Sequence, residues 1–272
     1  MKLNVHGPIK IALTIILSGA AWVCHSADEF GIEHNLADDK AGSHFVSVKA
    51  GGIEILKNAN GNGILFQSTP AGTIAFSAGF PGMSKLGRMD SLLILDDAKD
   101  IKTFEHSFCC EDNGLKLEWV NMFEYHRDVP GVMIESRVIN LTREAASCYQ
   151  YWTTDAIEKA YFTASGKVNV PGGGVLPLQA SAGWVFFPIN GKGGVGMIVG
   201  DASGILFSNF RNGKGLWGMR TTTQGKEVFK EGQGSVLKFI LFFAASSEKA
   251  KELYGKIKKE NIFPGLWRKD VL

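Results

Sequence analysis

The chain has 272 residues and a formal net charge of +2 at pH 7, with 29 Lys and Arg against 27 Asp and Glu. No polybasic run interrupts this balance, which argues against nucleic acid and against anionic membrane surfaces as partners. Gly is abundant, with 33 residues, whereas Pro is scarce, with 8. Together with many Phe and β-branched residues, this composition is typical of short strands joined by tight turns.

The N-terminus has the layout of a secretory signal peptide. Two lysines give a positive start, and the uncharged apolar run of residues 11–23 follows. Small residues come next, so we expect cleavage after Ser26 or Ala27. The run is too short to span a membrane comfortably. We therefore predict a signal peptide over residues 1–27 and a secreted or periplasmic protein that has no membrane association after cleavage.

Two other interpretations of this stretch stay open. Cys24 would be the lipidated residue of a lipoprotein, although Val23 stands where a small residue is preferred. A buried N-terminal helix is the other interpretation, although nothing caps it and charged residues follow at once. No later segment reaches the length of a transmembrane helix. No linker divides residues 28–272, which we expect to form one domain.

The first part of the mature chain alternates short strands with turns. Predicted strands lie at residues 44–48, 52–56, 64–67, 73–76 and 91–95. Residues 58–63 are rich in Asn and Gly, which tolerate positive φ and therefore indicate a turn.

The clearest strand pattern runs from residue 101 to residue 155. Lys102, Phe104, His106, Phe108 and Cys110 share one face of a first strand. After a turn at residues 112–114, a second strand has Leu115, Leu117, Trp119, Asn121, Phe123 and Tyr125 on one face. Further turns separate a third strand at 132–139 and a fourth at 148–154. Four runs of period two with turn residues between them predict an antiparallel meander.

The rest of the chain predicts more strands and one helix. Strands are expected at residues 183–188, 195–199, 205–210, 215–220 and 235–243. Ser246 offers a helix N-cap, and Ala250, Leu253, Tyr254 and Ile257 fall on one helix face. The basic residues 256–259 suit the negative end of the helix dipole. The sequence therefore predicts an all-β fold, a large antiparallel sandwich with one C-terminal α-helix.

Three cysteines follow the signal peptide: Cys109, Cys110 and Cys148. In an oxidising compartment, one disulfide from Cys148 to a member of the adjacent pair is conceivable. A Cys109–Cys110 bridge and three free thiols are the alternatives. No Cys/His spacing matches a zinc site, so we predict a structural role and no metal.

Three short motifs match functional patterns by spelling. Residues 191–196 fit G-x-G-x-x-G, but a strand-like run follows them instead of a helix, which favours a hairpin turn. Residues 96–100 hold three Asp, but a Lys stands among them and no downstream acid completes a calcium loop, which favours a solvated turn. Asn140-Leu-Thr142 is an N-glycosylation sequon, and Asn is also common at strand ends.

Aromatic and polar clusters suggest a carbohydrate surface. Tyr149, Tyr151 and Asp155 lie on one face of the fourth strand, and Glu135 and Arg137 lie on one face of the strand before it. Aromatic rings suit the apolar faces of sugar rings, while charged side chains suit their hydroxyls. These five residues are our carbohydrate-binding candidates. The alternative is that the aromatic residues, with Trp152 and Trp184, are core and the charges are cross-strand pairs.

The matching positions Gly114, Leu115, Asp128, Pro130-Gly131-Val132, Arg137, Asn140 and Thr142 carry a family resemblance. The segment that contains them resembles the galactose mutarotase-like β-supersandwich. The version at the N-terminus of α-galactosidase-type glycoside hydrolases is the most similar. The runs at 196–200 and 234–243 and the helix at 246–257 are similar to the way that domain ends. The resemblance implies a β-supersandwich with one C-terminal helix.

Two departures limit what the resemblance implies about activity. The glycosidases carry their catalytic carboxylates in a barrel domain after the helix, and no such barrel stands in this sequence. Aldose 1-epimerases use an H-P-Y type motif and a late Glu, whereas no such motif is present and no His follows His126. Fold kinship by itself does not confer function.

We therefore expect an exported carbohydrate-binding protein that serves as an accessory or sensing module for glycan processing, without a cofactor. Whether it is an enzyme stays open. A sugar-active enzyme (an epimerase, a polysaccharide lyase or a glycosidase relative) would use His126, Glu135, Arg137 and Asp155 as acid, base and charge-stabilising groups. A structural envelope protein is the third possibility.

Overall fold

The computed structural model describes residues 30–35, 45–50, 53–58, 63–69, 72–79, 91–112, 114–147, 151–154, 160–169, 175–177, 183–189, 191–200, 205–209, 217–221 and 228–267. The first large sheet contains β1 (Ile32–Asn35), β2 (Phe45–Ala50), β3 (Ile53–Asn58), β4 (Gly63–Thr69), β5 (Gly72–Gly79), β11 (Tyr151–Thr154), β18 (Trp217–Thr221), β17 (Ile205–Asn209) and β14 (Val175–Pro177), in that spatial order. We call it sheet I.

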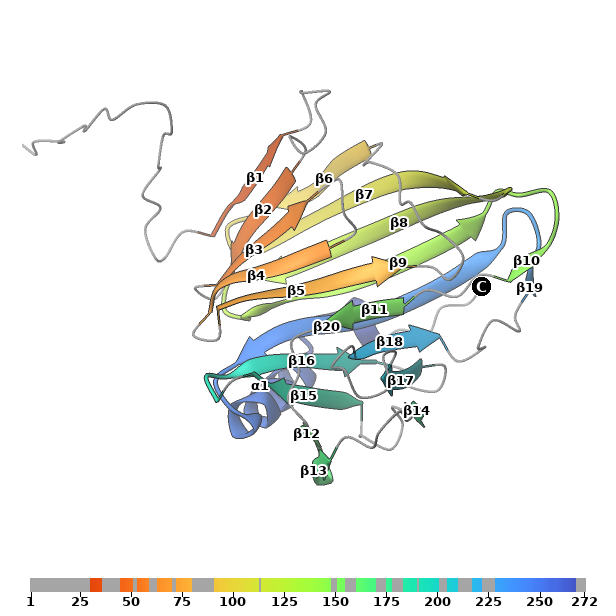
Figure 1. The fold of residues 1–272 in the computed structure, drawn as a ribbon. Coiled ribbons are helices and arrows are strands. Elements are labelled where there is room, and N and C mark those ends of the chain that lie inside the picture. The colour runs from red at the N-terminus through yellow and green to blue at the C-terminus, as the bar shows by residue number, and fades with distance from the viewer. Residues whose placement is uncertain are drawn as a thin grey trace, which may run out of the picture.

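The second large sheet, sheet II, has the order β13 (Gly166–Asn169), β12 (Ala160–Thr163), β15 (Trp184–Pro188), β16 (Gly194–Val199), β20 (Gly234–Ala244), β9 (Gly131–Asn140), β8 (Leu115–His126), β7 (Ile101–Asp112) and β6 (Ser91–Asp97). A small third sheet pairs β10 (Ala146–Ser147) with β19 (Val228–Phe229). The two large sheets stack, and the helix α1 (Ser247–Glu260) lies on the side of sheet II away from sheet I (Figure 1). The predicted antiparallel β-sandwich with one C-terminal α-helix is confirmed.

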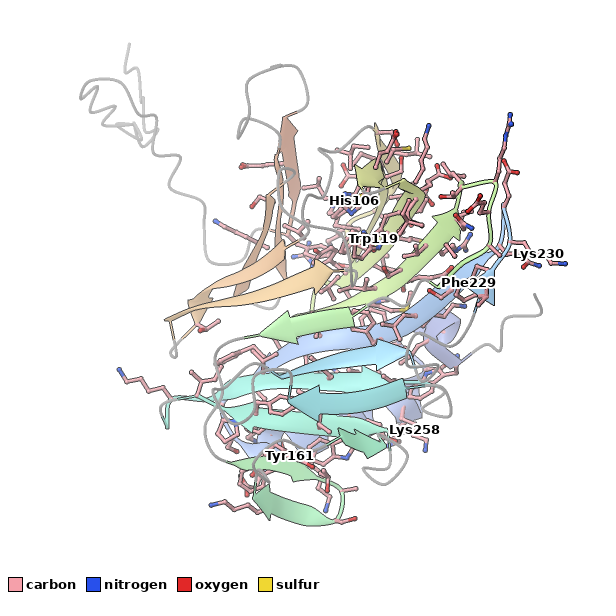
Figure 2. All side chains as sticks on the ribbon, turned by 45° about the vertical axis from the view of Figure 1, so that its right-hand side comes forward. His106, Trp119, Tyr161, Phe229, Lys230 and Lys258 are labelled. Carbon is pink, nitrogen blue, oxygen red and sulfur yellow. The ribbon has the colours of Figure 1, made fainter. Side chains whose placement is uncertain are left out.

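Sheet II has an inner face toward sheet I and an outer face that carries α1. In β8 the predicted alternation holds, because Leu117, Trp119, Asn121, Phe123 and Tyr125 are all buried on the inner face. The residues between them are half-buried on the outer face. Figure 2 shows Trp119 and the neighbouring His106 on the side of these strands toward sheet I. Because successive side chains of β8 point to opposite sides of the sheet, the predicted alternation gives the strand one buried face and one half-buried face.

Two glycines fix the geometry of the β7–β8–β9 meander. Gly114, in the turn before β8, has φ of +78°, where a side chain would be strained. Gly131, at the start of β9, lies so close to β20 that a Cβ atom there would be 2.5 Å from the carbonyl oxygen of Leu241. Gly131 therefore lets β9 and β20 approach each other.

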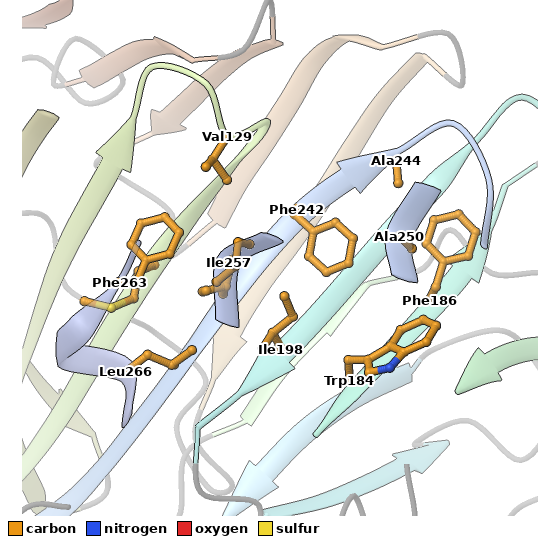
Figure 3. Packing of buried hydrophobic residues seen from close by; sticks show 12 residues of the cluster. Val129, Trp184, Phe186, Ile198, Phe242, Ala244, Ala250, Ile257, Phe263 and Leu266 are labelled. Atoms are coloured by element: carbon orange, nitrogen blue, oxygen red, sulfur yellow. The ribbon is translucent and has the colours of Figure 1, made fainter. Parts of the chain in front are cut away.

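The C-terminal helix packs on the outer face and covers part of it. Ser246 caps the helix, since its side chain accepts a hydrogen bond from the backbone N–H of Lys249, and Asn261 ends it in the left-handed conformation. Where the helix meets sheet II, buried residues form a cluster that Figure 3 shows from close by: Val129, Met133, Trp184, Phe186, Ile198, Ile240, Phe242, Ala244, Ala250, Ile257, Phe263 and Leu266. Trp184 is therefore a core residue, as one of the two interpretations of the sequence held.

The structure places the fourth strand of the predicted meander in sheet I and not beside the third strand in sheet II, so this part of the prediction is wrong. Strands β7, β8 and β9 pair in sequence as expected. The next neighbour of β9 is β20, whereas β11 pairs with β5 and β18 in sheet I. A run of period two reports which residues alternate, but not which strand is its neighbour, because the pairing of distant segments is decided by tertiary packing.

One further sequence prediction can be compared with the structure, which also contains a hairpin that was not predicted. The glycine motif at residues 191–196 forms the turn between β15 and β16, with φ of +65° at Gly191 and +107° at Gly193, so the hairpin interpretation is confirmed. The β12–β13 hairpin, at residues 160–169, was not predicted, because its strands have only four residues each. The predicted signal peptide lies outside the described residues.

Among the helices of the described part of the chain, none is long and apolar enough to cross a membrane.

Candidate functional site

The structure brings Glu135 and Arg137 together on the outer face, as predicted from their spacing. The Arg137 guanidinium donates a 2.6 Å hydrogen bond from Nε to Oε1 of Glu135. On the other side of Glu135, its Oε2 lies 3.4 Å from the Nζ atom of Lys238 on β20. The Glu135 side chain is only 7% exposed, whereas that of Arg137 is 55% exposed. The buried carboxylate thus holds two cations, and Arg137 alone of the three extends well into solvent.

Tyr151, one of the two aromatic residues of the predicted carbohydrate surface, lies in the other sheet from this ion cluster. Tyr151 begins β11 in sheet I, whereas Glu135 and Arg137 point away from sheet I. Tyr149 and Asp155 lie outside the described residues. The residues that flank Arg137 on the outer face are Val120 of β8 and Val236 of β20. Among the described neighbours, the ion cluster therefore lacks an aromatic ring on which a sugar would stack.

His126, the predicted catalytic candidate, is the last residue of β8. Its Nε2 lies 2.7 Å from Oε1 of Glu124, and its ring meets the ring of Phe263 edge-on at 4.6 Å between centroids. Both side chains of the pair are about one-fifth exposed. The pair holds the end of β8 against the segment after α1, which is a structural role.

A second polar group lies on the inner face and was not predicted as a site. His106 of β7, Asn121 of β8 and Ser136 of β9 are directly opposite one another in the strand register. We call these three residues the inner polar row. All three are 2% exposed or less. The Nδ2 atom of Asn121 is 2.9 Å from Nε2 of His106, and the Trp119 indole donates a 2.7 Å hydrogen bond to Ser136.

One atom of the row has an unmet hydrogen-bonding capacity. The side-chain carbonyl oxygen of Asn121 is buried and has no hydrogen-bond partner among the described residues. A buried polar atom without a partner costs about 1–3 kcal/mol, so such an atom is normally satisfied by water or by a ligand. This oxygen is an acceptor that a bound hydroxyl group would satisfy.

A stack of aromatic rings begins beside His106 of the inner polar row. Phe123 lies 5.3 Å from His106 between ring centroids, and Phe104 stacks on Phe123 at 5.0 Å. Tyr125 stacks on the other side of Phe104, at 5.8 Å, and burial raises the pKa of Tyr125 far above its ordinary value. The phenol is therefore neutral at every physiological pH. A few polar groups among apolar and aromatic walls are typical of small-molecule sites.

The row lies close to the edge of sheet II. His106 pairs with Leu92 of β6, which is the edge strand. Leu92 is half-buried, so it is the described side chain that separates His106 from the end of the sheet. A ligand that reaches the row from this edge would have to displace Leu92.

A signal for the inner polar row was present in the sequence. Asn121 interrupts an otherwise apolar series of alternate residues in β8, and His106 does the same between Phe104 and Phe108 in β7. Only the strand register shows that Asn121 and His106 lie opposite each other, and the sequence of a single strand does not reveal its register.

The acidic turn at residues 96–100 and the sequon residue Asn140 both form side-chain contacts with other residues of the chain. Asp97 and Asp100 pair with Lys102 and Arg127, at 2.5 Å and 2.9 Å, so these carboxylates already neutralise cations. In the part of the chain that the structure describes, no group of three His, Cys, Asp or Glu side chains is placed to hold a metal ion. Asn140 is fully buried, and its Nδ2 atom donates to the carbonyl oxygens of Glu144 and Phe229.

The two adjacent cysteines point to opposite faces of β7. Cys109 is exposed and Cys110 is buried, and neither forms a disulfide in the described part of the chain. Successive residues of a strand face opposite sides, which rules out the Cys109–Cys110 bridge. Cys148 lies outside the described residues.

No protein-family model matches the chain, and no curated protein matches it. Among solved structures, a galactose mutarotase-like protein from Clostridium acetobutylicum is 10% identical, with a TM-score of 0.49, and the match covers 80% of this chain and 99% of that one. A galactose mutarotase-like protein from Lactobacillus casei is 7% identical, with a TM-score of 0.42, over 74% of this chain and 100% of the other.

A GH36 α-galactosidase from Geobacillus stearothermophilus is 8% identical, with a TM-score of 0.49, over 82% of this chain and 43% of that enzyme. These three solved structures are of the two kinds that the sequence resemblance names. At identities of 10% or less, the likeness concerns the fold alone.

Proposed function

We propose that this protein is an exported carbohydrate-binding β-sandwich protein, an accessory or sensing module for glycan processing. We also propose that residues 28–272 act as one domain. The sugar is bound on the inner face of sheet II, and the inner polar row supplies its hydrogen bonds. The predicted surface around Glu135 and Arg137 on the outer face is the competing location.

The observation that carries the proposal is the buried carbonyl oxygen of Asn121, which has no hydrogen-bond partner among the described residues and lies next to His106 and its aromatic neighbour Phe123. A sugar hydroxyl donates to such an oxygen, while the apolar C–H face of a pyranose suits a ring such as that of Phe123. The ion cluster of the outer face offers charges, and the described residues that flank Arg137 in the strand register are both Val. The inner face therefore combines both kinds of contact that a sugar requires.

A test that separates the two faces uses one variant on each. Asn121→Leu keeps the volume of the side chain and removes its carbonyl oxygen, while Arg137→Gln removes the exposed cation of the outer face. We expect Asn121→Leu to abolish retention on polysaccharide affinity gels and on a glycan array, and Arg137→Gln to leave retention unchanged. Loss of retention in Arg137→Gln alone would move the site to the outer face.

Folding controls are needed because Asn121 is a hydrogen-bond partner of His106. The double variant His106→Phe, Asn121→Leu removes both partners, which costs less stability than leaving one of them unsatisfied. It should melt cooperatively and bind no glycan. A wild-type protein that binds no glycan on the array overturns the proposal. Turnover of a bound glycan would instead support the sugar-active enzyme.

Export has its own test. The purified protein from an exporting host should begin at residue 27 or 28, as N-terminal sequencing would show. A chain that keeps residues 1–26 after export, or a lipid on Cys24, would contradict the predicted signal peptide.

A further inference from the structure

The edge strand β6 is unusual in exposing large apolar side chains. Leu93 is 56% exposed and Leu95 is 49% exposed. They are two of the three exposed large hydrophobic residues in the described part of the chain, and the third, Val228, lies far away in the small sheet. An exposed edge strand with apolar side chains is a template for pairing with another strand.

Among the described residues, β6 pairs with β7 on one side only, because it is the last strand of sheet II. On its other side, alternate backbone N–H and C=O groups point away from the sheet. A second strand that is added there extends the sheet by main-chain hydrogen bonds, and its specificity comes from the side chains that become neighbours.

The sequence of β6, SLLILDD, is complementary to itself in an antiparallel register. When Ile94 lies opposite Ile94 of a second copy, each Leu93 lies opposite a Leu95. The same register places Asp97 opposite Ser91 and Asp96 opposite Leu92, so no two carboxylates meet. Like charges directly opposite each other would destabilise the pair, whereas apolar pairs stabilise it.

The acidic end of β6 is compatible with this pairing. Asp97 is held by the Nζ atom of Lys102 at 2.5 Å, and Asp96 accepts a 2.8 Å hydrogen bond from the backbone N–H of Ala98. Both carboxylates are thereby neutralised or occupied within their own chain. A β-bulge at Leu95, between Ile94 and Asp96, limits the regular stretch to a few residues. The contact is therefore that of a reversible dimer and not of a permanent one.

The geometry points to a symmetric dimer in which β6 of two copies pair antiparallel and join two copies of sheet II into one continuous sheet. A two-fold axis passes beside Ile94, and the four leucines at positions 93 and 95 form one apolar cluster on the outer face. Because Leu92 of the same strand adjoins His106, the dimer also places two inner polar rows on either side of the joined edge.

The test is the mass of the purified protein in solution, by sedimentation equilibrium over a range of concentrations. We expect a monomer–dimer equilibrium for the wild type and a monomer for the double variant Leu93→Lys, Leu95→Lys, because charged side chains block edge pairing. Both leucines are exposed, so these changes leave the fold intact, as circular dichroism and the melting temperature would show.

A matched control is Val228→Lys, which adds the same charge at a residue that is 59% exposed but lies on β19. It should dimerise like the wild type. In a second approach, Ile94→Cys should form a disulfide-linked dimer on mild oxidation, while Leu92→Cys, which lies opposite Asp96, should not. A wild-type protein that is monomeric at every concentration, or a dimer that persists in the double lysine variant, overturns the inference.

Discussion

The indole Nε1 of Trp119 and the hydroxyl of Ser136 form a 2.7 Å hydrogen bond in the fully buried interior between the sheets. It joins β8 to β9 through side chains, in addition to the backbone ladder. The bond fixes the orientation of the largest buried side chain beside the inner polar row.

Ser136→Ala removes this acceptor and leaves the indole N–H in an apolar interior. A buried donor that loses its partner costs about 1–3 kcal/mol, so we expect the free energy of unfolding to fall by about that amount. Urea denaturation would measure it. Ser91→Ala is a suitable control, because its hydroxyl bond to Ser107 is exposed to solvent.

Replacement of Gly131 and of Gly255 by Ala should change the stability of the protein in opposite directions. At Gly131 a Cβ atom would lie 2.5 Å from the Leu241 carbonyl oxygen and 2.7 Å from the Phe242 Cβ, so Gly131→Ala should destabilise the protein by about 1–3 kcal/mol. At Gly255, inside α1, nothing lies within 4 Å of the added atom. Gly255→Ala should therefore stabilise the protein by about 0.5–1 kcal/mol. Thermal melts of the two variants compare them directly, and equal effects would contradict the packing of β9 on β20.

Asn140 should carry no glycan even in a host that glycosylates sequons. Its side-chain oxygen accepts from the backbone N–H of Thr142 at 2.8 Å, while its nitrogen donates to Glu144 and Phe229. Intact mass of the protein secreted from a eukaryotic host should equal the unmodified mass. Asn140→Ala should also destabilise the fold by about 1–3 kcal/mol, because it removes the hydrogen bonds of a buried side chain to two part-buried carbonyl groups and to the backbone N–H of Thr142. A glycan found at Asn140 would place this residue on the surface.

The first turn of α1 should have a pH-dependent stability. The hydrogen bond from Ser246 is the largest of the contributions that lower the pKa of Glu248 below its ordinary value. A folded-state pKa below the unfolded one means that this stabilisation is present above the ordinary pKa and is lost as the pH falls through the lower value. Helix ellipticity should therefore fall on acidification below about pH 4.5, and the fall should be smaller in Glu248→Gln. An unchanged acid profile in that variant would contradict the role of Glu248.

The sequence predicted local structure well and long-range pairing poorly. Alternation in residues 115–139 and the Ser246 cap depend on neighbours in the chain, and both were recovered. The strand that pairs with residues 151–154 lies more than 60 residues away in the chain, and the sequence did not predict this pairing. The predicted placement of Glu135 and Arg137 on one strand face is confirmed, because the two residues are separated by one period of a strand.

Three positions of the motif that carried the family resemblance have structural roles. Gly114 provides a turn with positive φ, Gly131 permits close strand approach, and Asn140 ties the end of β9 to β19. These positions specify a fold and hold no reacting group. The binding residues of such a fold are therefore to be sought at positions that break the apolar pattern, as Asn121 and His106 do.

The most direct test of the account is a calorimetric titration of the best glycan from the array into the wild type and into Asn121→Leu. We predict that the variant keeps a cooperative melt and binds at least about tenfold more weakly, which corresponds to the loss of about 1.4 kcal/mol. Equal affinity of the two proteins would show that the carbonyl oxygen of Asn121 takes no part in binding, and that the sugar is not bound on the inner face of sheet II.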